Sequence, residues 1–279
     1  MRATLRRVRI LFVGDVVGSA GRTVVEGLLP GLMESEQPDF VVINGENAAG
    51  GVGITPKTAH ALFNAGADAI TLGNHAFRHR DVYDLLDRDE RIVRPANYPK
   101  AAPGRGYTLV EKDGKRLGVV NLSGMLYLEA ARSAFPEADA VLAELRGRAD
   151  HVLVDMHAEA TSEKVAMGWH LDGRVTACVG THTHVATADA RVLPGGTAYV
   201  TDVGMTGARD GVIGVRREQA LARFLTQVPT RFEPSDEDPW LNAVLIDADD
   251  SGKATGIRQL LLPYSPNNAA SNAGVNQTM

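Results

Sequence analysis

Short apolar runs alternate with helical patterns along the first third of the chain, and this order constrains the fold more than any other feature of the sequence. The apolar runs predict strands over residues 8–13, 40–43 and 69–72. Helical patterns cover residues 21–34 and 56–65, and Thr55 followed by Pro56 suits the start of the second helix. Because strands that are joined through helices run parallel, the order predicts an α/β fold with a parallel sheet and helices on its faces.

The rest of the chain continues with further strands and another helix. Strands are predicted over residues 117–122, 152–156, 175–179 and 199–201, and a helix over residues 137–146. Later segments are typical of hairpin strands and suggest a second, more antiparallel sheet: residues 191–193, 243–247 and 257–262. No linker is long enough to separate two domains, so residues 1–263 are predicted to form one domain. Residues 264–279 lack apolar periodicity and are predicted to be a flexible tail.

The composition is that of an ordinary globular protein, because 44% of the 279 residues are hydrophobic and 23% are charged. Such a chain can bury a full core. The formal net charge of -5 gives no basic surface for long nucleic acid, which argues against long DNA as a partner but leaves room for a positive pocket around one phosphate. The single cysteine, Cys178, lies in an apolar run and is predicted to be a buried packing residue.

Arginines precede the first apolar run, as they do in secretory signals. The apolar run from Ile10 ends at Gly14 and Asp15, however, and this is too short for a signal and favours a buried strand. No window approaches the roughly 20 apolar residues of a membrane span. We therefore expect a cytoplasmic protein without a membrane segment.

Residue types that bind hard metal ions follow the predicted strands at their carboxyl ends. The clusters are Gly14-Asp15, Asn44-Gly45-Glu46-Asn47, Gly73-Asn74-His75, His157 and Gly180-Thr181-His182-Thr183-His184. Ligands of open α/β sheets gather at this edge of the sheet. Carboxylates, amide oxygens and imidazoles in this number suit two divalent ions, so the clusters predict a dinuclear hydrolytic site.

Each cluster also has a purely structural explanation when it is taken alone. Gly14-Asp15 is typical of a turn, the loop over residues 44–53 of a glycine-rich connection, and Asn74 of a helix cap. His182 and His184 are harder to explain in this way, because alternate positions of a strand point both imidazoles to one side. The succession of all the clusters in one chain favours the metal site.

Together these clusters resemble the metal-binding motifs of the calcineurin-like metallophosphoesterases, which have the forms D-x-H, G-D, G-N-H, H and G-H-x-H. The chain departs from that pattern at two positions, with Val17 where the superfamily has a histidine and Glu46 where it has a bridging aspartate. The phrases GDVVG, NGENAAGG, GNHAF, GTHTHV and TDVGMTG are more similar to the YmdB-like branch, which comprises bacterial 2′,3′-cyclic-nucleotide 2′-phosphodiesterases. The resemblance extends from Arg9 to about Pro263.

The resemblance implies a sandwich of two mixed β-sheets flanked by helices in the order α/β/β/α. It also implies a division of the ligands between two metal ions: Asp15, Glu46, Asn47 and His184 for the first, and Glu46, Asn74, His157 and His182 for the second. Glu46 bridges the two ions, and the amide of Asn47 replaces the imidazole that Val17 lacks. Iron or manganese is the expected metal, with zinc as an alternative, since the ligands include no thiolate.

A water molecule that bridges two such ions loses a proton near neutral pH, and the resulting hydroxide can attack phosphorus in line, so no protein nucleophile is needed. By resemblance His75 is the general acid that protonates the leaving oxygen. Asp155 and Asp202 are candidates for orienting the histidine ligands, and a turn aspartate is the alternative for Asp202. Thr206 and Gly207 offer a hydroxyl and a backbone N–H for substrate phosphate.

The sequence excludes several other kinds of site. It has no P-loop motif around Gly50 to Gly53, no H-E-x-x-H and no G-x-S-x-G, and one cysteine cannot complete a deaminase zinc site. The leading hypothesis is hydrolysis of 2′,3′-cyclic nucleotides, or of a phosphodiester at an RNA end, to 3′-nucleotides. The alternatives are a broader phosphodiesterase or phosphomonoesterase, and a regulatory protein that binds a nucleotide or RNA end. Assembly into a homo-oligomer stays open.

Overall fold

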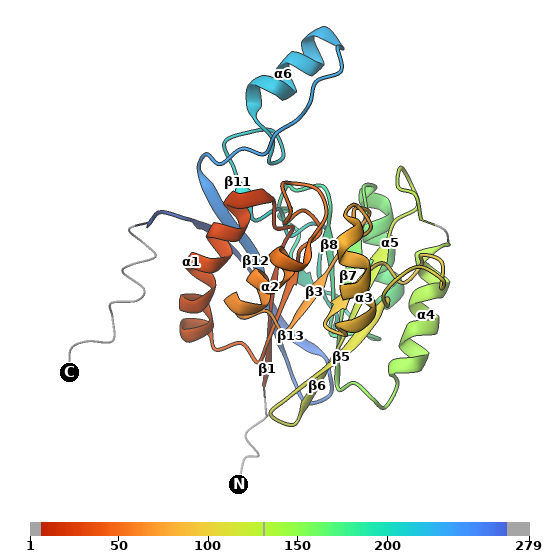
Figure 1. The fold of residues 1–279 in the computed structure, drawn as a ribbon. Coiled ribbons are helices and arrows are strands. Elements are labelled where there is room, and N and C mark those ends of the chain that lie inside the picture. Colours follow the sequence, from red (N-terminus) through yellow and green to blue (C-terminus); the bar gives the residue numbers. More distant parts are fainter. Residues whose placement is uncertain (1–6, 131, 267–279) are drawn as a thin grey trace, which may run out of the picture.

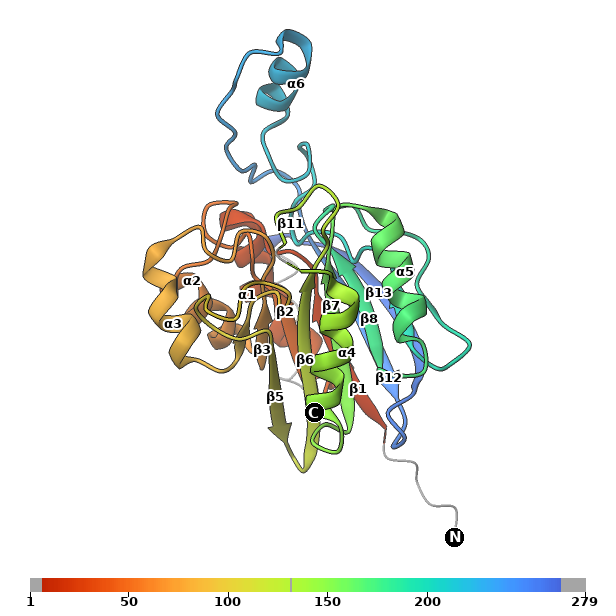
Figure 2. The same cartoon turned by 90° about the vertical axis from the view of Figure 1, so that its right-hand side faces the viewer.

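Two mixed β-sheets lie face to face in the centre of the computed structural model, and helices cover their outer faces (Figures 1 and 2). The structure describes residues 7–130 and 132–266. The first sheet has the strand order β11-β12-β1-β2-β3-β4, with β13 beside β12, and the second has the order β5-β6-β7-β8-β10-β9. This architecture confirms the predicted α/β/β/α sandwich.

The strands of the first sheet are β1 (Val8–Val13), β2 (Phe40–Asn44), β3 (Ala69–Thr71), β4 (Ile92–Val93), β11 (Gly207–Ala208), β12 (Pro239–Ala248) and β13 (Ala254–Pro263). Those of the second are β5 (Tyr107–Lys112), β6 (Lys115–Ser123), β7 (His151–His157), β8 (Ala177–Thr181), β9 (Arg191–Val192) and β10 (Ala198–Val200). The helices are α1 (Gly18–Glu36), α2 (Pro56–Ala65), the 3-10 helix η1 (Arg80–Val82), α3 (Tyr83–Arg88), α4 (Ala134–Leu145), α5 (Thr161–Leu171) and α6 (Arg217–Thr226).

β1 is apolar from Ile10 to Val13, because both of its faces are buried there, and Arg9 near its start pairs with Asp247. Ile10 and Phe12 face the second sheet, whereas Leu11 and Val13 pack with α1 and α2 on the outer side. α4 and α5 cover the outer face of the second sheet in the same way. Three apolar layers therefore hold the sandwich together, and such doubly covered strands are the continuous apolar runs that the sequence contains.

The start of α2 follows the chemistry predicted for it. Thr55 is the N-cap, and its hydroxyl accepts a hydrogen bond from the backbone N–H of Thr58 at 3.3 Å. The hydroxyl of Thr58 accepts one in return from the backbone N–H of Thr55 at 2.9 Å. This capping box and Pro56 in the first turn fix where the helix begins, directly after the loop that carries Glu46.

The prediction of a separate antiparallel sheet was wrong. β12 and β13 do form an antiparallel hairpin, but β12 also pairs antiparallel with β1, so the hairpin extends the parallel strands of the first sheet. β9 pairs antiparallel with β10 in the second sheet. Each sheet therefore contains both parallel and antiparallel strand pairs. β12 lies inside the first sheet because its apolar residues are buried on both faces, which is the pattern of a central strand.

Residues 209–238, between β11 and β12, carry α6 away from the sandwich (Figures 1 and 2). The predicted single domain stays a prediction, although the pairing of β1 with β12 joins the two ends of the sequence in one sheet. The predicted tail lies outside the described residues except for Tyr264, Ser265 and Pro266. Among the helices of the described ranges, none has the length and apolar character needed to cross a bilayer.

Candidate metal centre

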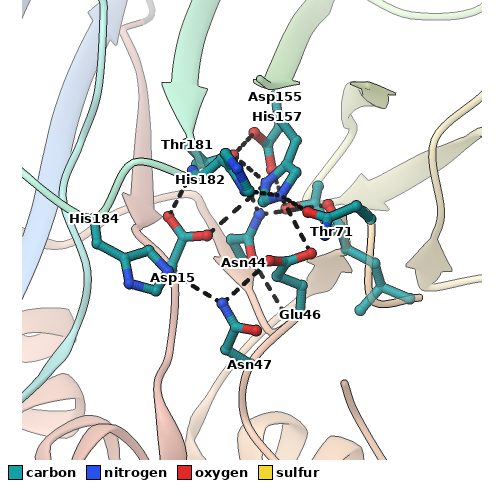
Figure 3. A network of polar contacts seen from close by, with 12 residues as sticks. Asp15, Asn44, Glu46, Asn47, Thr71, Asp155, His157, Thr181, His182 and His184 are labelled. Carbon is teal, nitrogen blue, oxygen red and sulfur yellow. Dashed lines mark hydrogen bonds and ion pairs between the residues drawn. The ribbon is translucent and has the colours of Figure 1, made fainter. Parts of the chain in front are cut away.

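All of the predicted ligands lie in one region at the carboxyl ends of parallel strands from both sheets, and Figure 3 labels each of them except Asn74. Asp15 follows β1, Glu46 and Asn47 follow β2, and Asn74 follows β3 in the first sheet, while His157 ends β7, and His182 and His184 follow β8 in the second. The face-to-face packing brings these two edges together. Residues from distant parts of the chain therefore share one site.

Three atoms that can donate a lone pair converge on Nε2 of the His157 imidazole. Its Nε2 lies 2.9 Å from Asn74 Oδ1, 3.2 Å from Glu46 Oε2 and 3.1 Å from His182 Nδ1. Potential ligand atoms of Glu46, His157 and His182 all lie within 4.8 Å of one another. These are the four residues predicted to hold the second metal ion.

The tautomer of His157 follows from its other nitrogen. His157 Nδ1 lies 2.9 Å from the hydroxyl of Thr181, and that hydroxyl donates to Asp155 Oδ1 at 2.7 Å. The Thr181 oxygen must then accept from Nδ1–H, which leaves Nε2 as the nitrogen that holds either a proton or a metal ion. Without a cation, the lone pairs of Nε2, a carboxylate and an amide oxygen cannot bond to one another, so this arrangement fits a cation.

A second group of atoms lies beside the first, around Asn47. Its Nδ2 lies 3.1 Å from Glu46 Oε1 and 3.1 Å from His184 Nε2. His184 Nδ1 donates to the backbone carbonyl of Ile213 at 2.9 Å, which leaves Nε2 as the free nitrogen. Asn47 Oδ1 points to His75, so the two lone-pair atoms that face the Asn47 amide nitrogen are Glu46 Oε1 and His184 Nε2. That placement suits the first metal ion of the predicted pair.

Asp15 has a buried carboxylate oxygen without a hydrogen-bond partner. The residue is fully buried, its Oδ2 accepts from the backbone N–H of His182 at 3.2 Å, and its Oδ1 has no partner. An unpaired buried carboxylate oxygen is costly, and a metal ion is a usual way of satisfying it. This orphaned atom fits the role of Asp15 as a ligand.

The charges of the cluster favour a bound cation. Burial alone would lower the pKa of His157, but the carboxylates of Glu46 and Asp15 outweigh it and raise the pKa to about 9. Burial and the neighbouring His157 lower the pKa of His182 to about 3, so that ring is neutral as a ligand must be. Burial opposes the charge of Glu46 too, yet His157 and His75 hold its pKa well below the usual range. The negative field that retains a proton here would also retain a metal ion.

His75 contacts the carboxylate of Glu46 as well. Its Nδ1 lies 2.9 Å from Asn47 Oδ1 and 3.3 Å from Glu46 Oε1, and its backbone N–H donates to Glu46 Oε2 at 3.2 Å. The residue is partly exposed. Its ring therefore stands at the edge of the cluster, where solvent and a substrate have access.

The path of the chain near the histidines differs from the predicted strand. β8 ends at Thr181, and His182 and His184 both have left-handed backbone conformations, with φ values of 96° and 66°. The argument from strand alternation was therefore wrong, although both rings still point into the cluster. Non-glycine residues rarely adopt positive φ values, and such strain is concentrated at functional sites.

A buried ion pair supports this strained turn. Lys164 of α5 is buried, and its ammonium group donates to Asp202 Oδ2 at 2.7 Å and to the carbonyl of Thr181 at 2.9 Å. Asp202 also accepts from the backbone N–H of Thr183 at 3.1 Å, and Thr183 stands between the two histidines. Asp202 thus holds the turn itself, which matches the turn aspartate that the sequence left open as the alternative to orienting a histidine ring.

Gly73 makes room for the cluster. A Cβ atom at this position would collide with Glu46 Oε2 and His157 Nε2. A glycine before Asn74 therefore lets the backbone approach the ligands closely, which explains the glycine of the Gly73-Asn74-His75 motif.

The predicted substrate contacts lie next to this region. The hydroxyl of Thr206 donates to the carbonyl of Asn242 at 3.1 Å and accepts from its backbone N–H at 3.1 Å, so both of its functions serve the strand pairing. Gly207 lines a cavity of about 370 Å³ that His184 also borders. The role of these two residues in binding phosphate stays a prediction.

Several residues of the site had no predicted role. Thr181, Thr71 and Asn44 surround Asp155, the last two through bonds of 2.6 Å and 2.9 Å to Asp155 Oδ2. The position of Thr181 inside the Gly180 to His184 motif was the available signal for it. Lys164 gave no signal, because a lysine on a helix normally faces solvent.

Replacing Thr181 by valine is expected to weaken metal binding by about 10–100-fold, because the change removes the acceptor that orients His157. Titration of metal-free protein with Mn²⁺ measures this effect. The matched control is Thr71→Val, which also removes a hydrogen bond to Asp155 but leaves His157 Nδ1 with its partner. Equal affinities for the two variants would contradict the orienting role of Thr181.

Comparison with known proteins bears on the same site. A family model described as YmdB-like protein matches residues 11–260. The chain belongs to this family. The match includes strands of both sheets and every predicted ligand.

Curated and solved relatives agree with this assignment. The 2′,3′-cyclic-nucleotide 2′-phosphodiesterase of Bacillus subtilis (strain 168) is 50% identical over 256 residues, which cover 91% of this chain and 97% of that protein. A hypothetical protein from Thermus thermophilus superimposes with a TM-score of 0.87 at 41% identity, covering 92% of this chain and all of that one. A protein of Mycoplasma pneumoniae described as a novel phosphatase gives the same TM-score at 32% identity, covering 96% of this chain and 98% of that one.

Proposed function

We propose that this protein is a metal-dependent phosphodiesterase that hydrolyses 2′,3′-cyclic nucleotides to 3′-nucleotides. The observation that carries the proposal is the convergence of lone-pair atoms around His157 Nε2, next to the orphaned carboxylate oxygen of Asp15. The name and the 50% identity of the Bacillus subtilis relative support the choice of substrate.

The side chains present fit two metal ions. Asp15, Glu46, Asn47 and His184 would hold one, and Glu46, Asn74, His157 and His182 the other, with Glu46 between them. When bound, a pair of such ions supplies an activated water and positive charge beside the phosphoryl oxygens. Imidazole, carboxylate and amide ligands without thiolate favour iron or manganese over zinc.

The chain itself contributes orientation and a proton. The carboxylate of Glu46 fixes the imidazole of His75 at 3.3 Å, so that its other nitrogen is free to face the substrate. Water adds to phosphorus, the bond between phosphorus and the 2′-oxygen breaks, and His75 gives its proton to that oxygen. The product is a 3′-monophosphate with a free 2′-hydroxyl, and the reaction consumes one water molecule.

A substrate panel tests this proposal. It contains 2′,3′-cyclic AMP, 3′,5′-cyclic AMP, bis-p-nitrophenyl phosphate and p-nitrophenyl phosphate, each assayed before and after chelation. We expect chelator-sensitive opening of 2′,3′-cyclic AMP to 3′-AMP as the preferred reaction. Preference for the monoester would instead support a phosphomonoesterase, as the description of the Mycoplasma pneumoniae protein suggests.

A further inference from the structure

A second cavity, of about 760 Å³, opens beside the metal cluster on the side of Asn74. Its lining includes Asn74, Phe77, Tyr98, Tyr127 and Leu128. Asn74 lies at both the cavity and the candidate metal centre, because it lines the cavity and its Oδ1 faces His157. A ligand whose phosphate lies at the cluster can therefore extend directly into this cavity, whose size is usual for small-molecule sites. We call it the aromatic cavity.

The inner wall of the aromatic cavity is fixed by packing. The rings of Phe77 and Tyr98 lie 5.9 Å apart and are inclined by 35°, and Tyr83 packs edge-on against Phe77 at 5.8 Å. Tyr98 is buried, and its surroundings raise the pKa of its hydroxyl to about 12 through burial, so it stays neutral. Two neutral aromatic rings held in place form a surface on which a flat ring can pack.

Tyr127 forms the outer wall of the aromatic cavity, and its side chain is exposed to solvent instead of packing in the core. Tyr127 is 87% exposed and has a left-handed backbone conformation with a φ of 68°. Glu163 of α5 anchors the loop just before it by accepting hydrogen bonds from the backbone N–H groups of Met125 at 2.9 Å and Leu126 at 3.1 Å. A bulky residue in this conformation costs free energy, and such residues cluster at ligand clamps.

The cavity of about 370 Å³ near His184 is the other candidate for binding the rest of the substrate. Its aromatic residue is Trp240, and the guanidinium of Arg209 already lies over that ring, 4.2 Å from its centroid. The aromatic cavity has a free aromatic side chain in Tyr127. This difference favours the aromatic cavity for stacking.

The chemistry of the substrate also favours the aromatic cavity over the cavity near His184. The reaction releases the 2′-oxygen, which sits on the ribose carbon next to the one that carries the base, so the base lies on the side of the leaving oxygen. His75, which protonates that oxygen in the proposed function, is followed after one residue by Phe77 of the aromatic cavity. Asn74 before His75 lines the aromatic cavity as well, so a base on the side of His75 has this cavity next to it.

We propose that the aromatic cavity is the nucleobase subsite and that Tyr127 is its specificity-determining residue, closing over a base that packs against Phe77 and Tyr98. This proposal rests on the proposed hydrolysis of 2′,3′-cyclic nucleotides. Stacking on aromatic side chains accepts any base, so the subsite distinguishes nucleotides from phosphodiesters without a base and discriminates little among the four bases.

The test compares 2′,3′-cyclic AMP with methyl ribofuranoside 2,3-cyclic phosphate, which has the same reacting ring and no base. For the wild-type protein we expect a higher kcat/KM with the nucleotide. Tyr127→Ala should lower the ratio of the two kcat/KM values by about 5–150-fold, the usual loss for one stacked base, and Tyr127→Phe should retain it. Leu126→Ala is the matched control, because Leu126 is an exposed neighbour outside the cavity lining.

The possible results distinguish failure of the nucleobase subsite from failure of the proposed hydrolysis. A wild-type ratio near one, or equal ratios for Tyr127→Ala and Leu126→Ala, would overturn the nucleobase subsite while the proposed hydrolysis stands. If the metal-loaded wild-type protein opens neither compound, the proposed function fails and the subsite falls with it. Because Tyr127 is 87% exposed, its replacement leaves the core intact, and circular dichroism of the variants checks this.

Discussion

Replacing Glu46 by glutamine is expected to lower the rate of 2′,3′-cyclic AMP hydrolysis by about 10³-fold or more. Both carboxylate oxygens of Glu46 face other ligands, Oε2 toward His157 at 3.2 Å and Oε1 toward Asn47 at 3.1 Å. An amide has one oxygen and no charge, so it cannot bridge two cations. Elemental analysis of the purified variant should show a loss of bound metal along with the loss of activity.

Glu159→Gln serves as the control for this change. The Glu159 carboxylate lies 3.0 Å from His182 Nε2, so it touches a ligand without being one in the proposed centre. Its replacement should retain bound metal and reduce activity by no more than about 10–100-fold, as orienting residues do. A Glu46→Gln protein with a full complement of metal and normal activity would show that Glu46 does not bridge.

Replacing His75 by alanine is expected to lower kcat for 2′,3′-cyclic AMP by about 10²–10⁴-fold while metal content is retained. The reason is that the alkoxide leaving group of a cyclic nucleotide needs a proton, and His75 stands at the partly exposed edge of the cluster, beside Glu46 and Asn47. Steady-state kinetics together with elemental analysis measure both parts of this prediction.

A substrate with a better leaving group separates this role from a structural one. p-Nitrophenolate departs without a proton, so His75→Ala should hydrolyse bis-p-nitrophenyl phosphate with a much smaller loss of kcat. If both substrates lose activity in equal proportion, His75 acts by holding Glu46 and Asn47 and not as an acid. His79→Ala is the matched control, because His79 lies on the same loop and bonds to the carbonyl of Val52 instead of the cluster.

The parts of the fold and site that the sequence predicted are those with one dominant physical cause. β1 and α2 have the predicted bounds, since the doubly buried part of β1 is an unbroken apolar run from Ile10 to Val13 and Thr55 with Pro56 marks a helix start. The candidate ligands could be selected because parallel strands end at one edge, which needs no knowledge of how the two sheets meet. Asp15, Glu46 and His157 follow from that rule alone.

The remaining parts depend on contacts between distant segments. The pairing of β12 with β1 could not be predicted, because its apolar pattern fits a hairpin as well as a central strand. The buried position of Lys164 depends on Asp202, which lies 38 residues further along the chain. Tyr127 lies in a loop without periodicity, and its exposure has a meaning only beside Phe77 and Tyr98. Local patterns carry no information of this kind.

The metal content of the purified protein tests the central claim most directly. Elemental analysis should find about two iron or manganese ions per chain, and chelation should abolish the opening of 2′,3′-cyclic AMP until metal is restored. A folded protein that contains no transition metal and takes up none on reconstitution would contradict the account, since the converging lone pairs around His157 and the unpaired oxygen of Asp15 would then need another explanation.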